Sequence, residues 1–320
     1  MTDYPRTLME LEARFSTEEA CREYLASLRW PEGFVCPHCG GTVAWPVGHN
    51  LQECSRCNRQ TSVIAGTIFD RLRTPLPVFF RAIWWVVTQK NGASALGLKR
   101  ILGIKSYRTA WTWLHKIRRA MVAPGRSRLS GEIEVDETYL GGLEEGVVGR
   151  ETYKKVLVVI AAQVDGKKIG RIRMRRISDA GGENLLSFIS DAIEPGSLVH
   201  TDGWSGYSGV SEAKYRHKIT NISQSTASAN ELLPRVHLVA SLLKRWILGT
   251  HQGAVNPAHL DSYLDEFTFR FNRRTSSSRG MLFYRLLQNA MSAAPAPYKK
   301  IIKGVRSGPE KVTRKRSNLT

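Results

Sequence analysis

Two short segments of the chain each have the pattern of a short β-strand that ends in an aspartate. Residues 132–142 contain Asp136, and residues 197–207 contain Asp202. Each segment is typical of a short β-strand followed by a turn rich in Gly or Thr. Two carboxylates at the ends of adjacent strands can hold divalent metal ions over a phosphodiester, whereas one such aspartate alone is commonly a turn cap. The pair predicts a metal site if the rest of the chain agrees.

The composition points to a polyanionic partner. Lys and Arg number 47 against 28 Asp and Glu, which gives a net charge of +19 and a pI near 10.0. Nucleic acid is the usual partner of so basic a chain, and a membrane surface is the rival. The sequence has neither a long apolar run that would span a bilayer nor an apolar signal core at residue 1. We therefore expect a cytoplasmic, nucleoid-associated protein with no membrane partner.

Four of the five cysteines lie in two CxxC pairs. Cys36 and Cys39 form the first pair, Cys54 and Cys57 the second, and 14 residues separate the pairs. Four thiolates at this spacing complete a tetrahedron around Zn²⁺ and leave no open position, so we predict a structural zinc ribbon. A redox motif needs one CxxC pair rather than two. The fifth cysteine, Cys21, lies in an expected helix over residues 8–28 and is interpreted as a buried residue.

A helical region follows the cysteines. Within residues 75–123 we expect three helices, of which 94–102 and 107–121 are joined by a glycine turn and fit a helix-turn-helix. Recognition residues lie at the start of the second helix of such a motif. A plain helical hairpin is the alternative, but the basic charge favours DNA binding. The residues expected to contact DNA are Lys105, Ser106, Arg108 and Thr109.

From residue 131 the apolar pattern changes to that of strands. The order along the chain is three strands, helix, strand, helix, strand, helix. We expect strands at 131–139, 154–164, 168–177, 197–201 and 215–219. A first helix is expected at 182–193 and two late helices over 234–248 and 257–273. This order predicts a ribonuclease-H-like α/β domain with a mixed sheet. In that topology the first and fourth strands are neighbours, which places Asp136 beside Asp202.

We therefore expect four regions along the chain. They are an N-terminal helix with a zinc ribbon, a helical DNA-binding region, an α/β catalytic domain and a basic C-terminal tail, at residues 1–70, 71–127, 128–290 and 291–320.

The chain resembles the bacterial insertion-sequence transposases of the ISXO type, which carry an N-terminal zinc ribbon and a DDE catalytic domain. Six segments carry the resemblance in order: FVCPHCG, TSVIAGT, VDETYLGG, HTDGWSGY, KRWILGTH and YLDEFTFRFNRR, at residues 34–40, 61–67, 135–142, 200–207, 244–251 and 263–274. It implies cleavage and transfer of double-stranded DNA at the terminal inverted repeats of a mobile element. Zn²⁺ would be structural, and Asp136 and Asp202 would bind catalytic Mg²⁺ or Mn²⁺.

Strand transfer requires two DNA ends to be held together, so we also expect a homo-oligomer on DNA. Lys244 and Arg245 are expected to contact the DNA backbone, with a solvated helix face as the alternative.

The sequence departs from the family at the third catalytic position. That position is often Asn, Glu or His, two residues before a lysine. Lys244 matches the lysine, but Leu242 stands at the matching position and cannot bind a metal. On the expected helix, His237 and Ser241 share a face with Lys244, and Glu266 lies on the next helix. We expect His237 or Glu266 to complete the site, while a capping or core role for His237 and a structural role for Glu266 remain open.

Two functions follow from these observations. The first is a DDE-type DNA transposase that uses a two-metal-ion mechanism. The alternative is a catalytically inactive DNA-binding protein derived from such a transposase, which the substitution at Leu242 motivates. A zinc-ribbon transcription factor would leave the large α/β domain without a role.

Overall fold

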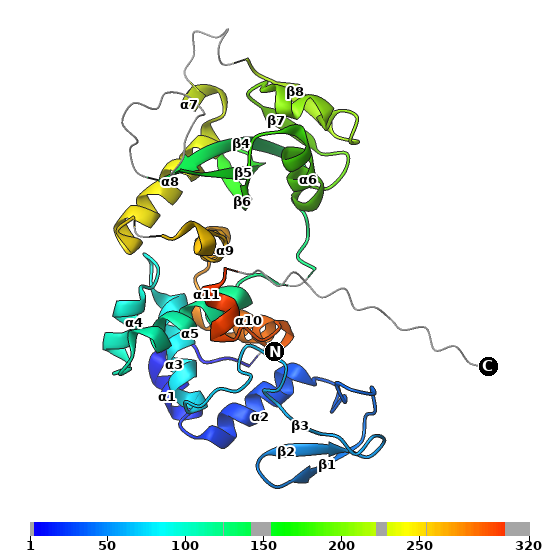
Figure 1. Ribbon diagram of the computed structural model, residues 1–320, viewed down its shortest axis with the longest axis vertical. Helices are drawn as coiled ribbons and strands as arrows, with labels where there is room; N and C mark the ends of the chain where they lie inside the picture. Colours follow the sequence, from blue (N-terminus) through cyan, green and yellow to red (C-terminus); the bar gives the residue numbers. More distant parts are fainter. Residues whose placement is uncertain (1–2, 124, 142–154, 222–228, 254, 305–320) are drawn as a thin grey trace, which may run out of the picture.

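Figure 1 shows the computed structural model of the chain, which describes residues 3–123, 125–141, 155–221, 229–253 and 255–304. The molecule is elongated: the larger β-sheet lies at one end, the small sheet of the cysteine region lies at the other, and helices lie between them. Within the described residues, no helix is both long and apolar enough to cross a membrane.

The N-terminal segment forms two helices rather than the single helix expected over residues 8–28. Helix α1 spans Leu8–Arg14 and α2 spans Glu18–Arg29. Thr17 lies in extended backbone and its hydroxyl accepts a hydrogen bond from the Ala20 amide at 3.2 Å, so α2 begins there. A threonine cap of this kind satisfies an amide that has no partner inside the helix. Cys21 is fully buried on α2, as expected.

The cysteine region forms a three-stranded antiparallel sheet with the order β1-β2-β3. Its strands are β1 (Ala44–Val47), β2 (Leu51–Cys54) and β3 (Gln60–Ser62). Within residues 31–60 the only buried side chains are those of Cys36 and Cys54. This small sheet therefore has almost no apolar core of its own.

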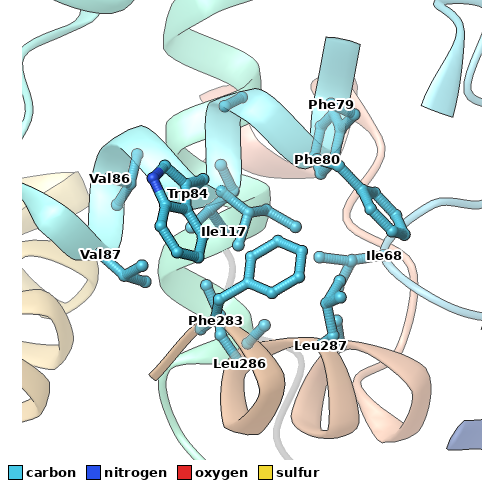
Figure 2. Close-up of a cluster of buried hydrophobic side chains, with 14 of the residues drawn as sticks. Ile68, Phe79, Phe80, Trp84, Val86, Val87, Ile117, Phe283, Leu286 and Leu287 are labelled. Atoms are coloured by element: carbon cyan, nitrogen blue, oxygen red, sulfur yellow. The ribbon is translucent and has the colours of Figure 1, made fainter. Parts of the chain in front are cut away.

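The helical region is built from α3, α4 and α5, and it is closed by a late helix, α10. These helices span Leu76–Thr88, Ala95–Ile101, Tyr107–Ala120 and Arg279–Ser292. Phe283 on α10 lies at the centre of the core, edge-on to Phe80 and to Trp84 of α3 with ring centroids 5.7 Å apart in both pairs (Figure 2). The division of the chain at residue 290 remains a proposal, and this packing favours counting α10 with the helical region.

The larger sheet has the strand order β6-β5-β4-β7-β8. β4 pairs antiparallel with β5 and parallel with β7, and β7 pairs parallel with β8. The strands are β4 (Glu132–Leu140), β5 (Val156–Asp165), β6 (Lys168–Ile177), β7 (Leu198–Thr201) and β8 (Arg216–Ile219). The first and fourth strands of the domain are thus neighbours, and the expected ribonuclease-H-like mixed sheet is confirmed.

Helices cover both faces of this sheet. One face packs on α6 and the 3-10 helix η1, and the other packs on α8 and α9. These elements span Gly182–Ala192, Ser205–Val210, Pro234–His251 and Leu260–Asn272. Three short helices complete the fold: α7 (Ala229–Leu232), η3 (Pro257–His259) and α11 (Tyr298–Ile302).

A buried ion network joins the sheet domain to the helical region. Glu266 on α9 is fully buried and accepts hydrogen bonds from Arg118 Nε of α5 at 2.7 Å and from Arg270 Nε at 2.9 Å. Arg270 also donates to the main-chain oxygens of Val86 and Gln89 at the end of α3. Burial alone would raise the pKa of Glu266, but the two guanidinium groups lower it to about 2. Glu266 is therefore an anion shared by two arginines.

We predict that Glu266→Gln lowers the stability of the protein by about 3–5 kcal/mol, because the buried guanidinium of Arg118 loses its counter-ion. Denaturant unfolding measures the change. Asp261→Asn is the matched control, since Asp261 lies 3.9 Å from Arg176 in a partly exposed pair and its loss should cost about 0–1 kcal/mol. A Glu266→Gln protein of wild-type stability that has lost DNA cleavage would show instead that this carboxylate serves the reaction.

Candidate functional site

The two aspartates lie on neighbouring parallel strands, although Asp136 stands in the middle of β4 and not at the strand end that the sequence predicted, because β4 continues to Leu140. The register of β4 and β7 pairs Glu132 with Leu198 and Glu134 with His200. The next alternate positions in that register are Asp136 and Asp202, and Asp202 directly follows β7. Because alternate residues share a face, this register places Asp136 and Asp202 on the same face of the sheet.

Helix α8 is fixed against β4 by a buried carboxylate. Glu134 is 2% exposed, and its Oε2 accepts hydrogen bonds from the amides of Arg235 at 2.7 Å and Val236 at 3.0 Å. Its Oε1 accepts from Arg235 Nη1 at 2.9 Å. α8 has no side-chain cap of its own, so Glu134 supplies the anion that its first amides require.

This anchoring brings His237 to Asp136. Glu134 and Asp136 share a face of β4, and His237 directly follows the two anchored residues of α8. His237 Nε2 lies 3.7 Å from Asp136 Oδ2, which is longer than a hydrogen bond. This nitrogen is buried and has no hydrogen-bond partner within the described part of the chain. An imidazole nitrogen and a carboxylate oxygen in this relation suit a shared metal ion.

The electrostatic surroundings keep His237 available as a ligand. Burial lowers the pKa of His237 and Lys244 lowers it further, while Glu134 and Asp202 oppose that shift. The imidazole is therefore neutral near pH 7, and a neutral imidazole is the form that binds metals.

A cavity of about 280 Å³ opens beside this pair. Its polar lining comes from the end of β4 and from one face of α8. The polar residues are Asp136, Glu137, Thr138, His237, Ser241 and Lys244. His237, Ser241 and Lys244 thus share a face, as the helical spacing predicted. Leu242 lies instead on the apolar side of α8, packed against the core between the helix and the sheet.

The sequence did not identify two carboxylates beside the aspartates. Glu134 is the α8 anchor described above, and Glu137 accepts a hydrogen bond from the Tyr207 hydroxyl at 2.8 Å. The signal for Glu134 was its position two residues before Asp136, on the same face of the strand. Burial raises the pKa of Tyr207, and Glu137, Asp136 and Asp202 raise it further, so the carboxylates gather around this hydroxyl.

Two expectations about the metal ligands are modified. Glu266 does not join Asp136 and Asp202, because its two oxygens accept hydrogen bonds from Arg118 of α5 and Arg270 of α9. Within the described residues, only the four cysteines bring three candidate ligand atoms within 4.8 Å of one another. Asp202 therefore stands farther from the Asp136–His237 pair than a closed metal site requires.

The four cysteines form the cluster that their spacing predicted. The sulfur atoms of Cys36 and Cys57 are 3.7 Å apart, and those of Cys39 and Cys54 are 3.6 Å apart. Four zinc–sulfur bonds of ~2.3 Å in a tetrahedron require sulfur separations of ~3.8 Å. The cluster fits a structural Zn²⁺. Beside it, Arg59 Nη1 lies 3.2 Å from His38 Nδ1, so His38 contacts an arginine on the rim.

The expected DNA-contacting residues lie on the surface of the helical region and of α8. Lys105, Ser106 and Arg108 are exposed and Thr109 is half-buried, while Ala110 and Leu114 of α5 are buried. Gly103 has a φ of 61°, which suits the turn between α4 and α5. Lys244 and Arg245 on α8 are exposed. The Arg108 guanidinium lies 5.2 Å from the ring of Tyr298, so α11 borders the start of α5.

We predict that Cys39→Ser lowers the zinc content of the purified protein and exposes the small sheet, because that sheet has almost no apolar core. Metal analysis gives the zinc content, and hydrogen exchange should rise over residues 36–62. Cys21→Ser is the control and should keep one zinc per chain, since Cys21 lies outside the cluster. Full zinc content in Cys39→Ser would exclude the four-cysteine site.

Comparison with known proteins agrees with this arrangement. Residues 128–272 match the ISXO2-like transposase domain, and residues 16–60 match the transposase zinc-ribbon domain. A protein in transposable element ISH50 of Halobacterium salinarum is 25% identical over 275 residues, which cover 80% of this chain and 91% of the relative.

Two solved structures are also similar. They are a pre-cleavage Mos1 transpososome, with 10% identity over 68% of this chain, and the Mos1 strand transfer complex, with 9% identity over 72%. Each match covers 79% of the Mos1 chain with a TM-score of 0.26. The assignment of the fold therefore rests on the strand order and not on this similarity. Residues 128–272 thus belong to the ISXO2-like transposase domain family, and residues 16–60 belong to the transposase zinc-ribbon family.

Proposed function

We propose that this insertion-sequence transposase binds the terminal inverted repeats of its element and catalyses metal-dependent cleavage and transfer of DNA strands. The observation that carries the proposal is that Asp136 Oδ2, on the strand beside β7, lies 3.7 Å from His237 Nε2 in a polar cavity. Asp202 follows the neighbouring strand in register. The net charge of +19 supports DNA as the substrate.

Asp136, Asp202 and His237 would hold the catalytic Mg²⁺ or Mn²⁺. When bound, two such ions activate the attacking water or hydroxyl and stabilise the leaving oxygen. Asp136 and His237 offer one oxygen and one neutral nitrogen to the same space, and Asp202 would approach them. Lys244 lines the same cavity and can neutralise the phosphate that enters it.

The N-terminal half of the chain would bind the element ends. The zinc ribbon and the start of α5 present the surface for this role, with Lys105, Ser106 and Arg108 exposed. Joining two ends in one reaction requires a homo-oligomer on DNA, and a chain with these substrates would act at the nucleoid. The alternative is an inactive DNA-binding derivative, which the substitution at Leu242 suggested. The position of His237 in the cavity supports the active enzyme instead, because His237 can replace the ligand that Leu242 cannot provide.

We expect Asp136→Ala and Asp202→Ala each to abolish strand cleavage and transfer, because a carboxylate ligand is lost. The assay uses purified protein, Mg²⁺ and duplex DNA that carries the inverted repeat of the element. Binding of the same duplex should stay within a few-fold of wild type, since neither aspartate lies in the DNA-contacting helices. Cleavage at the wild-type rate by either variant would reject the assignment, and a wild-type protein that binds the repeat but never cuts it would favour the inactive derivative.

The third ligand has its own test. His237→Ala should strongly reduce cleavage. His237→Glu should retain part of the cleavage activity and should raise the ratio of activity in Mg²⁺ to activity in Mn²⁺. The reason is that a carboxylate oxygen suits Mg²⁺ better than an imidazole nitrogen does. Ser241→Ala, on the same cavity wall, should leave that ratio unchanged. An unchanged ratio in His237→Glu, with normal cleavage by His237→Ala, would show that His237 is not a ligand.

A further inference from the structure

The turn that carries Asp202 lies beyond the hydrogen-bonded part of its strand. The register of β4 and β7 ends at the pair Glu134 and His200, two positions before the aspartates. The strand pairing alone therefore does not fix the distance between the carboxylates of Asp136 and Asp202. Two carboxylates with no metal ion between them also repel each other. A site that binds divalent ions tightly needs a further contact that keeps this turn near β4.

Side chains of the turn form hydrogen bonds with different parts of the fold. Asp202 Oδ1 accepts a hydrogen bond from the Trp204 amide at 3.0 Å, which lies within the turn. Trp204 Nε1 donates to the main-chain oxygen of Ala180 at 2.8 Å, in the segment before α6. Tyr207 on η1 donates its hydroxyl to Glu137 Oε2 at 2.8 Å. This last contact joins the turn to β4.

The backbone of the turn folds tightly enough to allow this contact. Gly203 has a φ of 83°, in the left-handed region that favours glycine. A Cβ atom at Gly206 would clash with the main-chain oxygen of Ala180, so a glycine is needed where η1 approaches the segment before α6. The two glycines thus help to direct Tyr207, which closely follows Asp202 in the chain, into the core between η1, α6 and the sheet.

The Tyr207 side chain is suited to hold the turn in one place. It is fully buried, and its ring packs in the apolar core on the α6 side of the sheet, which limits the positions of its hydroxyl. Burial and nearby carboxylates raise the pKa of Tyr207, so the hydroxyl keeps its proton near pH 7 and donates it to the hydrogen bond. Glu137 directly follows Asp136 on β4. The acceptor of this hydrogen bond therefore lies one residue from a candidate metal ligand.

We propose that Tyr207 and Glu137 are positioning residues for the metal site. Their hydrogen bond keeps the turn of Asp202 close to Asp136, so the second carboxylate has only a short way to move when a divalent ion binds. The proposal rests on the proposed function, because it takes the two aspartates to be metal ligands. Without the hydrogen bond the turn moves away under the repulsion of the carboxylates, and metal binding must first restore its place.

Two other roles of these residues give different results in a test. Glu137 lines the cavity, and if it were itself a metal ligand, its negative charge would matter more than its hydrogen bond. If Tyr207 only filled the core, its hydroxyl would affect the stability of the protein and leave metal binding unchanged. Substitutions that keep the hydrogen bond but remove the charge separate the first of these roles, and a second buried tyrosine separates the other.

The experiment titrates Mn²⁺ into the zinc-loaded full chain and measures the dissociation constant of Mn²⁺ by electron paramagnetic resonance. Tyr207→Phe should raise this constant by about 10-fold, because a hydrogen bond that supports the metal ligands is lost. Tyr215→Phe is the matched control and should bind Mn²⁺ as the wild type does. Tyr215 is buried in the same core, but its hydroxyl donates to the main-chain oxygen of Ile193 at 3.1 Å.

Substitutions of Glu137 separate its hydrogen bond from its charge. Glu137→Gln keeps an oxygen that can accept from Tyr207 and should retain most of the Mn²⁺ affinity. Glu137→Ala should weaken Mn²⁺ binding as Tyr207→Phe does. The double variant Tyr207→Phe/Glu137→Ala should bind Mn²⁺ no more weakly than either single variant, because both substitutions remove the same hydrogen bond.

Three results overturn the positioning role. They are wild-type Mn²⁺ binding in Tyr207→Phe, an equal loss in Tyr215→Phe, and a loss in Glu137→Gln as large as that in Glu137→Ala, which would make Glu137 a ligand. Thermal unfolding verifies that each variant is folded, and if Tyr207→Phe does not fold, the two substitutions of Glu137 carry the same test.

Asp136→Ala tests the proposed function separately. If the wild type binds no Mn²⁺, or if Asp136→Ala binds Mn²⁺ as tightly as the wild type, the metal site is rejected together with the positioning role. If Asp136→Ala loses Mn²⁺ while Tyr207→Phe binds it normally, only the positioning role is rejected.

Discussion

The candidate site depends on one buried carboxylate, that of Glu134. It binds the first amides of α8 and the guanidinium of Arg235, and it does so from the same face of β4 that carries Asp136. An anion at the N-terminus of a helix both satisfies the unpaired amides and opposes the helix dipole. Because Glu134 fixes where α8 begins, the next residue of that helix, His237, must lie near Asp136. Glu134 thus sets where α8 begins on the sheet, and the apolar residues of α8 pack against the same face.

The two late helices therefore have different tasks. α8 carries His237, Ser241 and Lys244 to the cavity. α9 carries the carboxylate of Glu266, which is fully buried between Arg118 and Arg270. This ion network joins the sheet domain to α3 and α5. A carboxylate that neutralises two buried guanidinium groups cannot also hold a metal ion, because moving it would leave both cations uncompensated.

Much of this arrangement could be predicted from the sequence, and the remainder depends on contacts between distant segments. The apolar patterns predicted the strands of the sheet, and the strand order placed Asp136 beside Asp202. The cysteine spacing predicted the thiolate cluster. Helical periodicity placed His237 on the face of Lys244, but it could not choose between His237 and Glu266, since both lie on amphipathic helices. That choice required the contacts of Glu266 with Arg118 and of Glu134 with Arg235, each of which joins residues more than 100 positions apart in the chain.

The distribution of charge shows the same dependence on distant contacts. A net charge of +19 predicted a polyanionic partner but not a place for it. In the sequence, Arg171 and Arg175 are equivalent positions on one face of β6, four residues apart. The fold makes them different, because α6 brings Asp191 to Arg175 whereas the segment that precedes β4 offers Arg171 only a hydroxyl and a carbonyl. A charge whose partner is a carboxylate is neutral toward DNA, and one whose partners are dipoles keeps its full attraction for phosphate. The partners of the arginines, more than their number, thus determine which positive charges a carboxylate of the described residues compensates.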